Sequence, residues 1–312
     1  MQFPFKLLPN SDFDAVGFGT NAVDYLIRVP AYPAFNSKIE LDDYARAAGG
    51  EAASTMVGLR RLGMETAYVG RFGGDHNGEY GLRSLVDEGV DTTLTERISE
   101  ARTQIAFILI DARNGERTIV WHRDKRLAYT HSNVPLKAAT RGKILHLTPH
   151  DTRACVRLAR LARDNGVIVS IDIDRVFDSV DELLPLVDIL IASAEFPEKL
   201  FGIKDEHRAL REIKAQFGCP VIGLTRGASG SVVLAEDSII ATPAFDIPGG
   251  CVDTTGAGDA FRAGFLFGLL THESIEDSSR MANAVAALKC RGLGARATLP
   301  TKKQLITLLK KG

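Results

Sequence analysis

Short apolar runs of strand length alternate along this chain with amphipathic stretches of helix length. The clearest cycle begins near Thr152, where apolar side chains recur at three-residue spacing until Asn165-Gly166 supplies a helix stop. The elements predicted from the pattern are helices over 153–163 and 205–217 and strands over 167–173, 188–192 and 220–225. This alternation predicts an α/β, Rossmann-like fold, a three-layer sandwich of a mostly parallel sheet with helices on both faces.

Two stretches interrupt the alternation. Residues 24–47 contain Pro30 and Pro33 between short β-like pieces, and residues 103–122 are predicted to form two strands around a turn at residues 112–115. Both stretches lie outside the βα cycles. We therefore expect a small β-rich lid inserted into a single domain that spans residues 1–312, where the lid would cover a site.

Composition narrows the class of protein. The chain has 312 residues, of which 45% are hydrophobic, and its 38 basic and 39 acidic side chains give a formal net charge of −1. Disorder and nucleic-acid binding are therefore disfavoured. The four cysteines form no CxxC pair, which favours a reducing compartment over a disulfide framework. Because no apolar run reaches the roughly 18 residues of a membrane span and the first residues lack a signal-peptide core, we expect a cytoplasmic protein without a membrane partner.

One glycine-rich segment fits a known nucleotide motif but in the wrong context. Residues 17–22, Gly-Phe-Gly-Thr-Asn-Ala, match the dinucleotide fingerprint GxGxxA, which would indicate an NAD-dependent oxidoreductase. That fingerprint must open a helix, whereas residues 23–30 have strand propensity and end at Pro30. We interpret the segment as a turn between a strand and a loop. A Walker A loop is absent from the sequence.

The strongest chemical signal is the run of small residues around Gly256, Ala257 and Gly258. It precedes a nearly apolar stretch over 260–270 that predicts a buried helix. Free backbone amides at the start of a helix, with the positive end of the helix dipole behind them, form an anion hole. Asp259 would repel an anion there unless it takes a proton from a second reactant, so it is a candidate general base. The alternative is a glycine-rich turn with Asp259 as a helix-start residue.

Two segments carry a family resemblance. Residues 253–259, Asp-Thr-Thr-Gly-Ala-Gly-Asp, resemble the C-terminal signature of the ribokinase-like (PfkB) carbohydrate kinases, and residues 49–54 with 69–78 are similar to the first signature. The resemblance covers nearly the whole chain. It implies a ribokinase-like fold and transfer of the γ-phosphoryl of ATP to a sugar hydroxyl, with Mg²⁺ as cofactor and K⁺ as a candidate second cation. Gly256, Ala257 and Gly258 would hold the phosphoryl oxygens and Asp259 would accept the proton.

The resemblance also implies further site residues. The residues implied for the sugar are Asp24, at the end of the first strand, with Gly49, Gly50 and Ser54. The residues implied for the nucleotide are Thr225, Gly227, Gly230 and Asn283. The residues implied for cations are Glu195 for Mg²⁺ and Asp253 for a monovalent cation. Residues 286–296 resemble the segment that lines the adenine pocket and the monovalent-cation site. Taken alone, Asp24 could be a solvated loop acid, residues 225–230 an ordinary turn and Asn283 an exposed helix residue.

Several residues depart from the family pattern. Ser193 and Phe196 replace the Asn and Glu of the NxxE motif, which leaves Glu195 as the neighbouring carboxylate. Glu51, Ser54 and Thr148 stand where ribokinases carry Lys, Asn and a sugar-binding Glu. These departures argue against ribose as the acceptor. Residues 114–122 and 169–174 are similar to parts of ketohexokinase-like enzymes, and residues 286–290 and 294–296 to sulfofructose kinases, which favours a ketohexose.

Three functions remain open. The leading hypothesis is an ATP-dependent kinase for a sugar such as fructose or ribose. The second is a nucleoside or sugar-phosphate kinase of the same family, for which basic residues are available at Arg97, Arg102 and Arg123. The third is a non-catalytic sugar-binding relative, which the intact Asp259 disfavours. On the lid, Trp121, His122 and Arg123 could contact a sugar, a partner lid or solvent. Exposed lid edges lead us to expect a homodimer joined through the lid.

Overall fold

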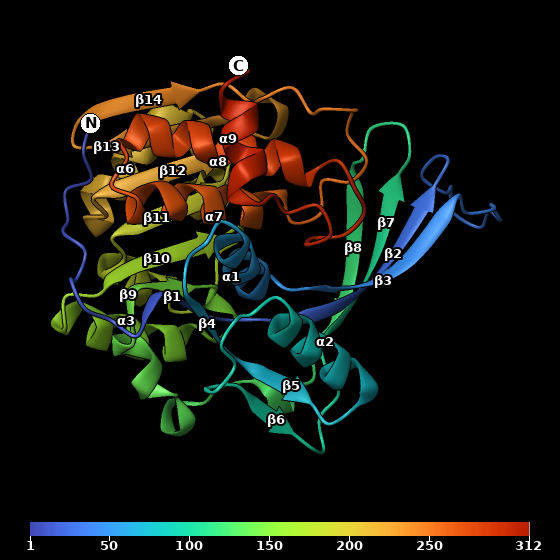
Figure 1. Ribbon diagram of the computed structural model, residues 1–312, viewed down its shortest axis with the longest axis horizontal. Coiled ribbons are helices and arrows are strands. Elements are labelled where there is room, and N and C mark those ends of the chain that lie inside the picture. Colours follow the sequence, from blue (N-terminus) through green and yellow to red (C-terminus); the bar gives the residue numbers. More distant parts are fainter. Residues whose placement is uncertain (312) are drawn as a thin grey trace.

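The computed structural model describes residues 1–311, and its main sheet has eight strands (Figure 1). The strand order is β14-β13-β12-β11-β10-β9-β1-β4. Neighbouring strands from β4 to β12 are parallel, whereas β13 and β14 each pair antiparallel with the preceding strand. The strands are β1 (Phe13–Phe18), β4 (Thr66–Val69), β9 (Gly142–Leu147), β10 (Ile168–Ile173), β11 (Ile189–Ser193), β12 (Val221–Thr225), β13 (Ser231–Ala235) and β14 (Ser238–Thr242).

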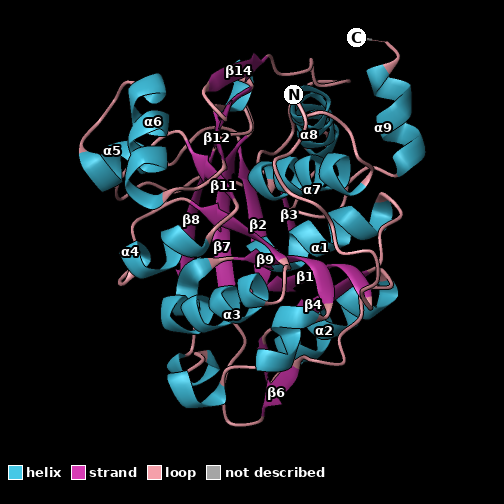
Figure 2. Cartoon of the chain, turned by 90° about the vertical axis from the view of Figure 1, so that its left-hand side faces the viewer, coloured by secondary structure: helices cyan, strands magenta, loops and turns pink. Residues whose placement is uncertain are grey.

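Helices cover both faces of this sheet (Figure 2). One face packs against α1 (Glu51–Arg61), α7 (Ala257–Leu270), α8 (Ile275–Lys289) and α9 (Lys302–Leu309). The other packs against α3 (Thr152–Asp164), α4 (Val180–Leu183), α5 (Phe196–Phe201) and α6 (Glu206–Phe217). Strands of a parallel sheet are buried on both sides, which is why β10 is apolar or small at most positions and buried throughout. The predicted three-layer α/β fold is confirmed.

Local signals set the ends of the predicted elements. Asp205 accepts a hydrogen bond from the Arg208 amide at 2.7 Å and so caps the start of α6. Gly218 ends the helix in the left-handed conformation with φ 72°. The helix over 205–217 and the strand over 220–225 are therefore confirmed to within a residue, as are the predicted helix and strand of the cycle that begins at Thr152.

A second sheet of four strands stands beside the large one (Figure 1). It has the order β3-β2-β7-β8 and is built from β2 (Ala22–Val29), β3 (Asp43–Gly49), β7 (Ile105–Asp111) and β8 (Arg117–His122). These strands overlap the two stretches predicted as a lid, and β2 begins at Ala22, the last residue of the segment over 17–22, so no helix opens there. A short parallel pair, β5 (Arg71–Gly73) and β6 (Glu96–Ile98), and helix α2 (His76–Asp87) complete the chain. That the second sheet acts as a lid on a single domain stays a prediction.

The two faces of this lid sheet differ. Leu26 and Ile108 lie on the inner face, where they pack with Leu293 of the main body. Tyr44, Phe107 and Val120 lie on the outer face and are 73%, 44% and 61% exposed. The lid sheet therefore buries one apolar face and leaves the other uncovered.

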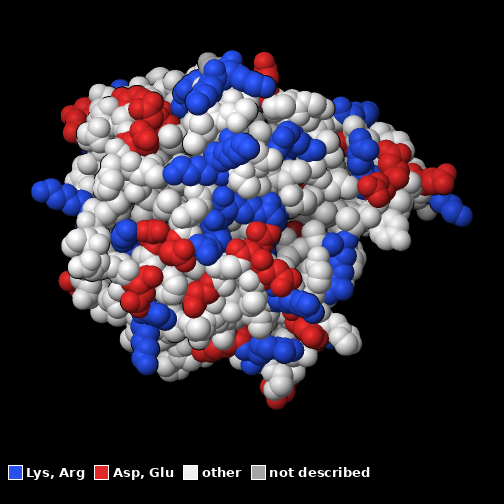
Figure 3. All heavy atoms as spheres, viewed as in Figure 1, with Lys and Arg blue, Asp and Glu red and all other residues white. Residues whose placement is uncertain are grey.

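The surface shows no single dominant charge on the face in view. Basic and acidic side chains are interspersed over it (Figure 3), in keeping with the net charge of −1. All four cysteines are free thiols. Among residues 1–311, no helix combines the length and the apolar character needed to cross a bilayer.

Candidate active site

The residues of the predicted anion hole lie at the start of α7, and their binding of an anion stays a prediction. Gly256 has φ 76° and lies so close to Ala295 that a Cβ would come within 2.8 Å of its Cα, so the position excludes side chains on two grounds. The amide of Ala257 donates to the Thr254 carbonyl at 3.1 Å. The expectation of three free amides is therefore wrong for Ala257, because the left-handed turn at Gly256 folds it back onto Thr254. Within residues 1–311, the partly exposed amides of Gly256 and Gly258 have no acceptor.

Asp259 faces other charged groups rather than packed hydrocarbon. It lies in the first turn of α7 with 9% exposure, and Asp172, near the end of β10, hydrogen bonds with its carboxyl group. The Arg262 guanidinium contacts Asp172, with Nη2 2.5 Å from Oδ1, and also donates to the Ile191 carbonyl at 2.9 Å. Burial raises the pKa of both Asp172 and Asp259, and Arg262 opposes this. Arg262 thus pairs directly with Asp172, and its charge also lowers the pKa of Asp259.

Gly258 lies against the side chain of Arg262. Helical side chains lean toward the N-terminus, so Arg262 reaches back along the first turn of α7. A Cβ on Gly258 would come within 2.5 Å of the Arg262 Nη1 atom. The guanidinium therefore lies directly against the segment whose amides form the anion hole. Neither Asp172 nor Arg262 was predicted as a site residue, although a charge inside a nearly apolar helix needs a partner and is in itself a signal.

Asp24 and the paired glycines meet at the junction of lid and body. Asp24 lies in β2, the second strand, and not at the end of the first strand as expected, because β1 ends at Phe18. A Cβ on Gly49 would overlap the Asp24 carboxylate, and Gly50, with φ 91°, precedes α1. Burial raises the pKa of Asp24 to about 7, while Arg296 lowers it. The structure thus brings Asp24, Gly49 and Gly50 together, and their predicted contact with a sugar stays a prediction.

Arg296 is a second buried cation that the sequence reasoning missed. Its Nε donates to the Ser54 hydroxyl at 3.1 Å, its Nη1 to the Ser84 hydroxyl at 3.0 Å, and its Nη2 to the Gly49 carbonyl. Burial lowers its pKa to about 10. The Ser54 hydroxyl, predicted to bind sugar, therefore already accepts a hydrogen bond from the protein. Hydrogen bonds from Arg296 therefore hold Ser54 and Gly49 in place.

The raised pKa of Asp24 predicts a pH dependence of stability. A carboxyl whose pKa moves from 3.8 to about 7 on folding contributes its full stability below about pH 4 and loses it as the pH rises through about 7. The Asp24→Asn variant lacks this loss. The free energy of unfolding of Asp24→Asn minus that of the wild type should therefore rise by about 3 kcal/mol between about pH 5 and about pH 8. Urea unfolding of both proteins measures this, and parallel pH curves would contradict it.

The predicted nucleotide loop lies at the end of β12. Thr225 pairs with Ser193 of β11, and the Ala194 amide donates to the Thr225 carbonyl at 3.1 Å. Gly227 and Gly230 have φ 55° and 83°, so both left-handed positions of the following turn are glycines. The segment with Ser193 and Glu195 therefore adjoins the loop over 225–230. Their role in holding ATP stays a prediction.

Asn283 lies on α8 and is 5% exposed, so it is not the exposed helix residue of the alternative interpretation. Its amide nitrogen donates to the Ser231 hydroxyl at 3.0 Å and to the Ser279 carbonyl at 3.1 Å. The bond to Ser231 links α8 to β13. The nitrogen is therefore engaged with the protein, and the predicted contact with adenine would fall to the side-chain oxygen.

Glu195 offers an exposed carboxylate. Its side chain is 78% exposed and lies 3.1 Å from the Lys199 ammonium. Over residues 1–311 there is no cluster of three His, Cys, Asp or Glu side chains that could hold a metal ion. A single exposed carboxylate fits a Mg²⁺ ion that keeps most of its water and arrives with nucleotide phosphates.

An aromatic group borders Glu51 at the rim of the site. The Trp121 and His150 rings are 6.1 Å apart, and His150 and Phe177 are 5.4 Å apart. The Arg175 guanidinium lies over both Trp121 and Phe177, and His150 Nδ1 is 3.5 Å from a Glu51 carboxylate oxygen. We refer to Trp121, His150, Phe177 and Arg175 as the aromatic rim.

The other predicted lid contacts are placed differently. Arg123 forms two hydrogen bonds with the Asp151 carboxylate, at 2.9 and 2.7 Å. It is therefore committed to the protein. His122 is exposed at the end of β8, and Arg97 and Arg102 are exposed on and after β6. The structure shows no contact that gathers Arg97, Arg102 and Arg123 into one basic cluster.

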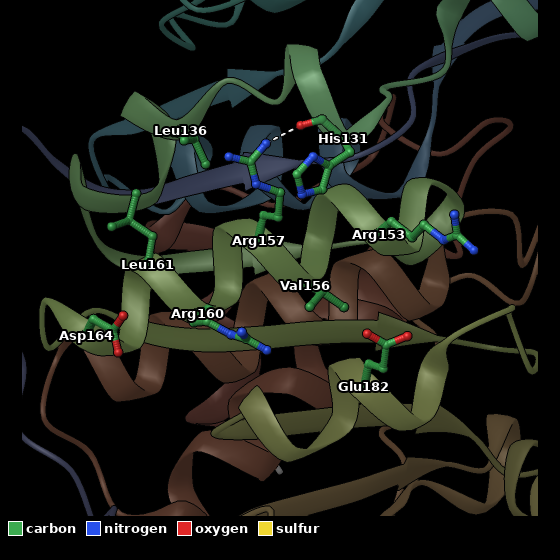
Figure 4. A pocket seen from close by; sticks show the side chains of 9 residues that line it. All are labelled: His131, Leu136, Arg153, Val156, Arg157, Arg160, Leu161, Asp164 and Glu182. Atoms are coloured by element: carbon green, nitrogen blue, oxygen red, sulfur yellow. Dashed lines mark hydrogen bonds between the residues drawn. The ribbon is translucent and has the colours of Figure 1, made fainter.

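Two hollows open on the surface, and Asp259 lines neither of them. One of about 650 Å³ runs along α3, where Arg153, Arg157 and Arg160 line one side (Figure 4), and none of the predicted site residues lines it. The other, of about 340 Å³, lies between β3, α2 and the loop around residue 296, and Arg296 forms part of its wall. The candidate site at α7 is therefore identified from Asp259 and the amides of Gly256 and Gly258, and not from either hollow.

Comparisons with known proteins cover almost the whole chain. The model of the pfkB family carbohydrate kinase matches residues 18–302. The chain is 28% identical over 299 residues to a ribokinase of Haemophilus influenzae (94% of this chain, 97% of that protein) and 28% identical over 288 residues to an ATP-dependent ribose-1-phosphate kinase of Halopiger xanaduensis (92% and 94%). The structure of Arabidopsis thaliana ribokinase complexed with ribose and ATP has a TM-score of 0.81 at 24% identity (96% and 99%).

Proposed function

The chain belongs to the pfkB family of carbohydrate kinases and is an ATP-dependent phosphotransferase, and we propose that its acceptor is the hydroxyl of a free sugar, a ketohexose such as fructose or a pentose such as ribose. The family assignment confirms the resemblance seen in residues 49–54 and 253–259. One observation carries the proposal: two free amides and a buried carboxyl meet at the start of α7. An amide hole and a base side by side suit transfer of a phosphoryl group to an alcohol.

The chemistry follows from positioning and charge. Phosphoryl transfer needs little covalent work from the protein and depends on alignment and on dispersal of negative charge. The amides of Gly256 and Gly258 would receive the γ-phosphoryl oxygens, and Asp259 would accept the proton of the sugar hydroxyl. Asp24, against the bare backbone of Gly49, would hold further hydroxyls of the sugar. ATP would enter with Mg²⁺, which would neutralise phosphate charge, and Glu195 would hold that ion's water shell.

The cysteines bear on where in the cell the protein works. Four free thiols suit the reducing conditions of the cytoplasm, which we keep as the proposed location.

A panel of acceptors tests the proposal. Purified protein is incubated with MgATP and ribose, fructose, other free sugars, nucleosides and sugar phosphates, and ADP formation is followed with Asp259→Asn as the control. We expect a free sugar to give the highest kcat/KM. Preference for a nucleoside or a sugar phosphate would move the function to the second class. Sugar binding without turnover for any acceptor would indicate a non-catalytic relative.

The aromatic rim favours a nucleoside as the second candidate acceptor. Trp121 is 46% exposed on the inner side of the lid sheet, next to His150 and Phe177, and a planar base could stack on such a surface. Arg175 forms no ion pair among the described residues, so an anionic acceptor group could also meet it. If a nucleoside is the acceptor, Trp121→Ala should raise its KM more than it changes kcat.

We also propose a homodimer joined through the lid. The outer lid face exposes Tyr44, Phe107 and Val120, and a second copy of the chain would cover the same apolar face. Val120→Glu should give a monomer, because a charge there would be buried without a partner. Light scattering on the eluting protein measures the mass, with Val86→Glu, at an exposed position of α2, as the matched control. A monomeric wild type, or a dimeric Val120→Glu, would contradict this proposal.

A further inference from the structure

Lys289, the last residue of α8, carries a fully buried ammonium group. Its side chain has 0% exposure, and its Nζ donates to the Asp253 carbonyl at 2.8 Å and lies 3.9 Å from Asp253 Oδ2. A buried lysine is rare unless an acid or several oxygens hold its charge. Here Asp253, also fully buried, supplies both a carbonyl and a carboxylate.

Asp253 is the residue that the family resemblance assigns to a monovalent cation, and its oxygens are already engaged. Oδ1 accepts the Thr255 amide at 2.8 Å, and Oδ2 accepts the Gly294 amide at 2.7 Å. The carbonyl accepts Lys289. A K⁺ ion coordinated by the same carbonyl would lie within a few ångströms of the lysine ammonium, and two positive charges so close in a buried place repel each other strongly. The residues present therefore do not fit a bound K⁺ ion.

The position of Lys289 connects it to the anion hole. Asp253 begins the loop that leads to Gly256, and its carboxylate links this loop to Gly294, one residue before the Ala295 that Gly256 packs against. The Lys289 carbonyl in turn accepts the Thr298 hydroxyl. A positive charge at Asp253 thus holds the hole-forming loop against the segment over 292–298. A cation bound at Asp253 would hold these two segments together in the same way.

We propose that the ammonium of Lys289 is a cation built into this protein, and that it takes the place at Asp253 where the family resemblance expects K⁺. The protein consequently needs no monovalent cation, either to hold the loop over 253–256 or to transfer phosphoryl groups. The kinetic part of this inference rests on the proposed kinase function. The structural part does not, because loop stability can be measured without any substrate.

The experiment compares the wild type with Lys289→Met in KCl, NaCl and choline chloride at equal ionic strength. Thermal unfolding is recorded without substrate, and kcat/KM is recorded with MgATP and the best acceptor. We expect the wild type to behave alike in KCl and choline chloride. We expect Lys289→Met to lose about tenfold or more of kcat/KM in choline chloride and to recover activity and unfolding temperature in KCl, because the emptied position can then take the ion. Lys303→Met, an exposed lysine of α9, is the matched control.

Each outcome decides the inference. Activation or stabilisation of the wild type by K⁺ beyond that by choline overturns it. So does a Lys289→Met protein that folds but does not respond to K⁺ in either measurement. If Lys289→Met does not fold in any of the salts, Lys289→Gln replaces it. The comparison of the wild type in KCl and in choline chloride tests the inference without any variant. If no acceptor is turned over, the unfolding temperatures decide, which separates a failure of this inference from a failure of the proposed function.

Discussion

Asp259→Asn is expected to lower kcat by about 10² or more while the fold persists. The asparagine keeps the shape of the side chain but cannot accept the proton of the acceptor hydroxyl. It also removes a negative charge that raises the pKa of the Asp24, Glu51 and Asp172 carboxyls. The unfolding temperature of Asp259→Asn should therefore equal or exceed that of the wild type.

Steady-state kinetics with saturating MgATP and acceptor, together with thermal unfolding, measures both effects. Asp178→Asn, an exposed acid in the loop before α4, is the matched control and should leave both quantities unchanged. A folded Asp259→Asn protein with wild-type turnover would refute the role of Asp259. A variant that loses activity together with its fold would show only that the residue is structural.

Arg262→Gln should give the largest loss of stability. Removing one partner of a buried ion pair leaves an uncompensated charge and costs about 3–5 kcal/mol. Asp172, 8% exposed in its side chain, would lose the guanidinium 2.5 Å away. Urea unfolding measures the loss. Arg262→Lys, which keeps the charge, should recover part of it, and Asp172→Asn in the Arg262→Gln background should recover more, because the isolated carboxylate is then gone.

The same variant predicts a shift of the pH–rate profile. Arg262 is the cation that lowers the pKa of Asp259 most, with smaller contributions from Arg117, Arg296 and Lys289. Without Arg262 the pKa of Asp259 rises further, so the base takes up its proton at a higher pH. The acidic limb of kcat should move to higher pH in Arg262→Gln and to lower pH in Asp172→Asn, where the negative charge that repels Asp259 is gone. Shifts in the same direction, or none, would contradict this.

Much of the fold follows from periodicity and local stops. The helix over 205–217 could be predicted because its apolar spacing, its Asp205 cap and its Gly218 stop act within one segment. The placement of Asp259 beside the amides of Gly256 and Gly258 could be predicted for the same reason, since it follows from adjacent small residues at a helix start. The error at Ala257 shows the limit of this reasoning. Whether an amide is free depends on the φ angle of Gly256, which the sequence does not state.

The missing part of the site consists of contacts between distant segments. Arg296 meets the Gly49 carbonyl across 247 positions of the sequence, and Lys289 meets Asp253 across 36. No local pattern encodes such pairs, because they arise only when sheet order brings α8 and the loop after it back to the lid and α7. The sequence does show that Arg262 and Lys289 are unusual, because they are charged residues in helices whose buried sides are otherwise largely apolar or small.

In the proposed reaction, amides at the start of α7 receive the phosphoryl group beside a carboxyl that receives the proton. A crystal structure of the wild type with MgADP, aluminium fluoride and the best acceptor tests this most directly, because the fluoride complex mimics the group in transfer. We expect the fluoride ligands within hydrogen-bond distance of the Gly256 and Gly258 amides and the acceptor hydroxyl against the Asp259 carboxylate. A complex bound elsewhere, with Asp259 still turned toward Asp172 and out of reach of the acceptor, would contradict the account.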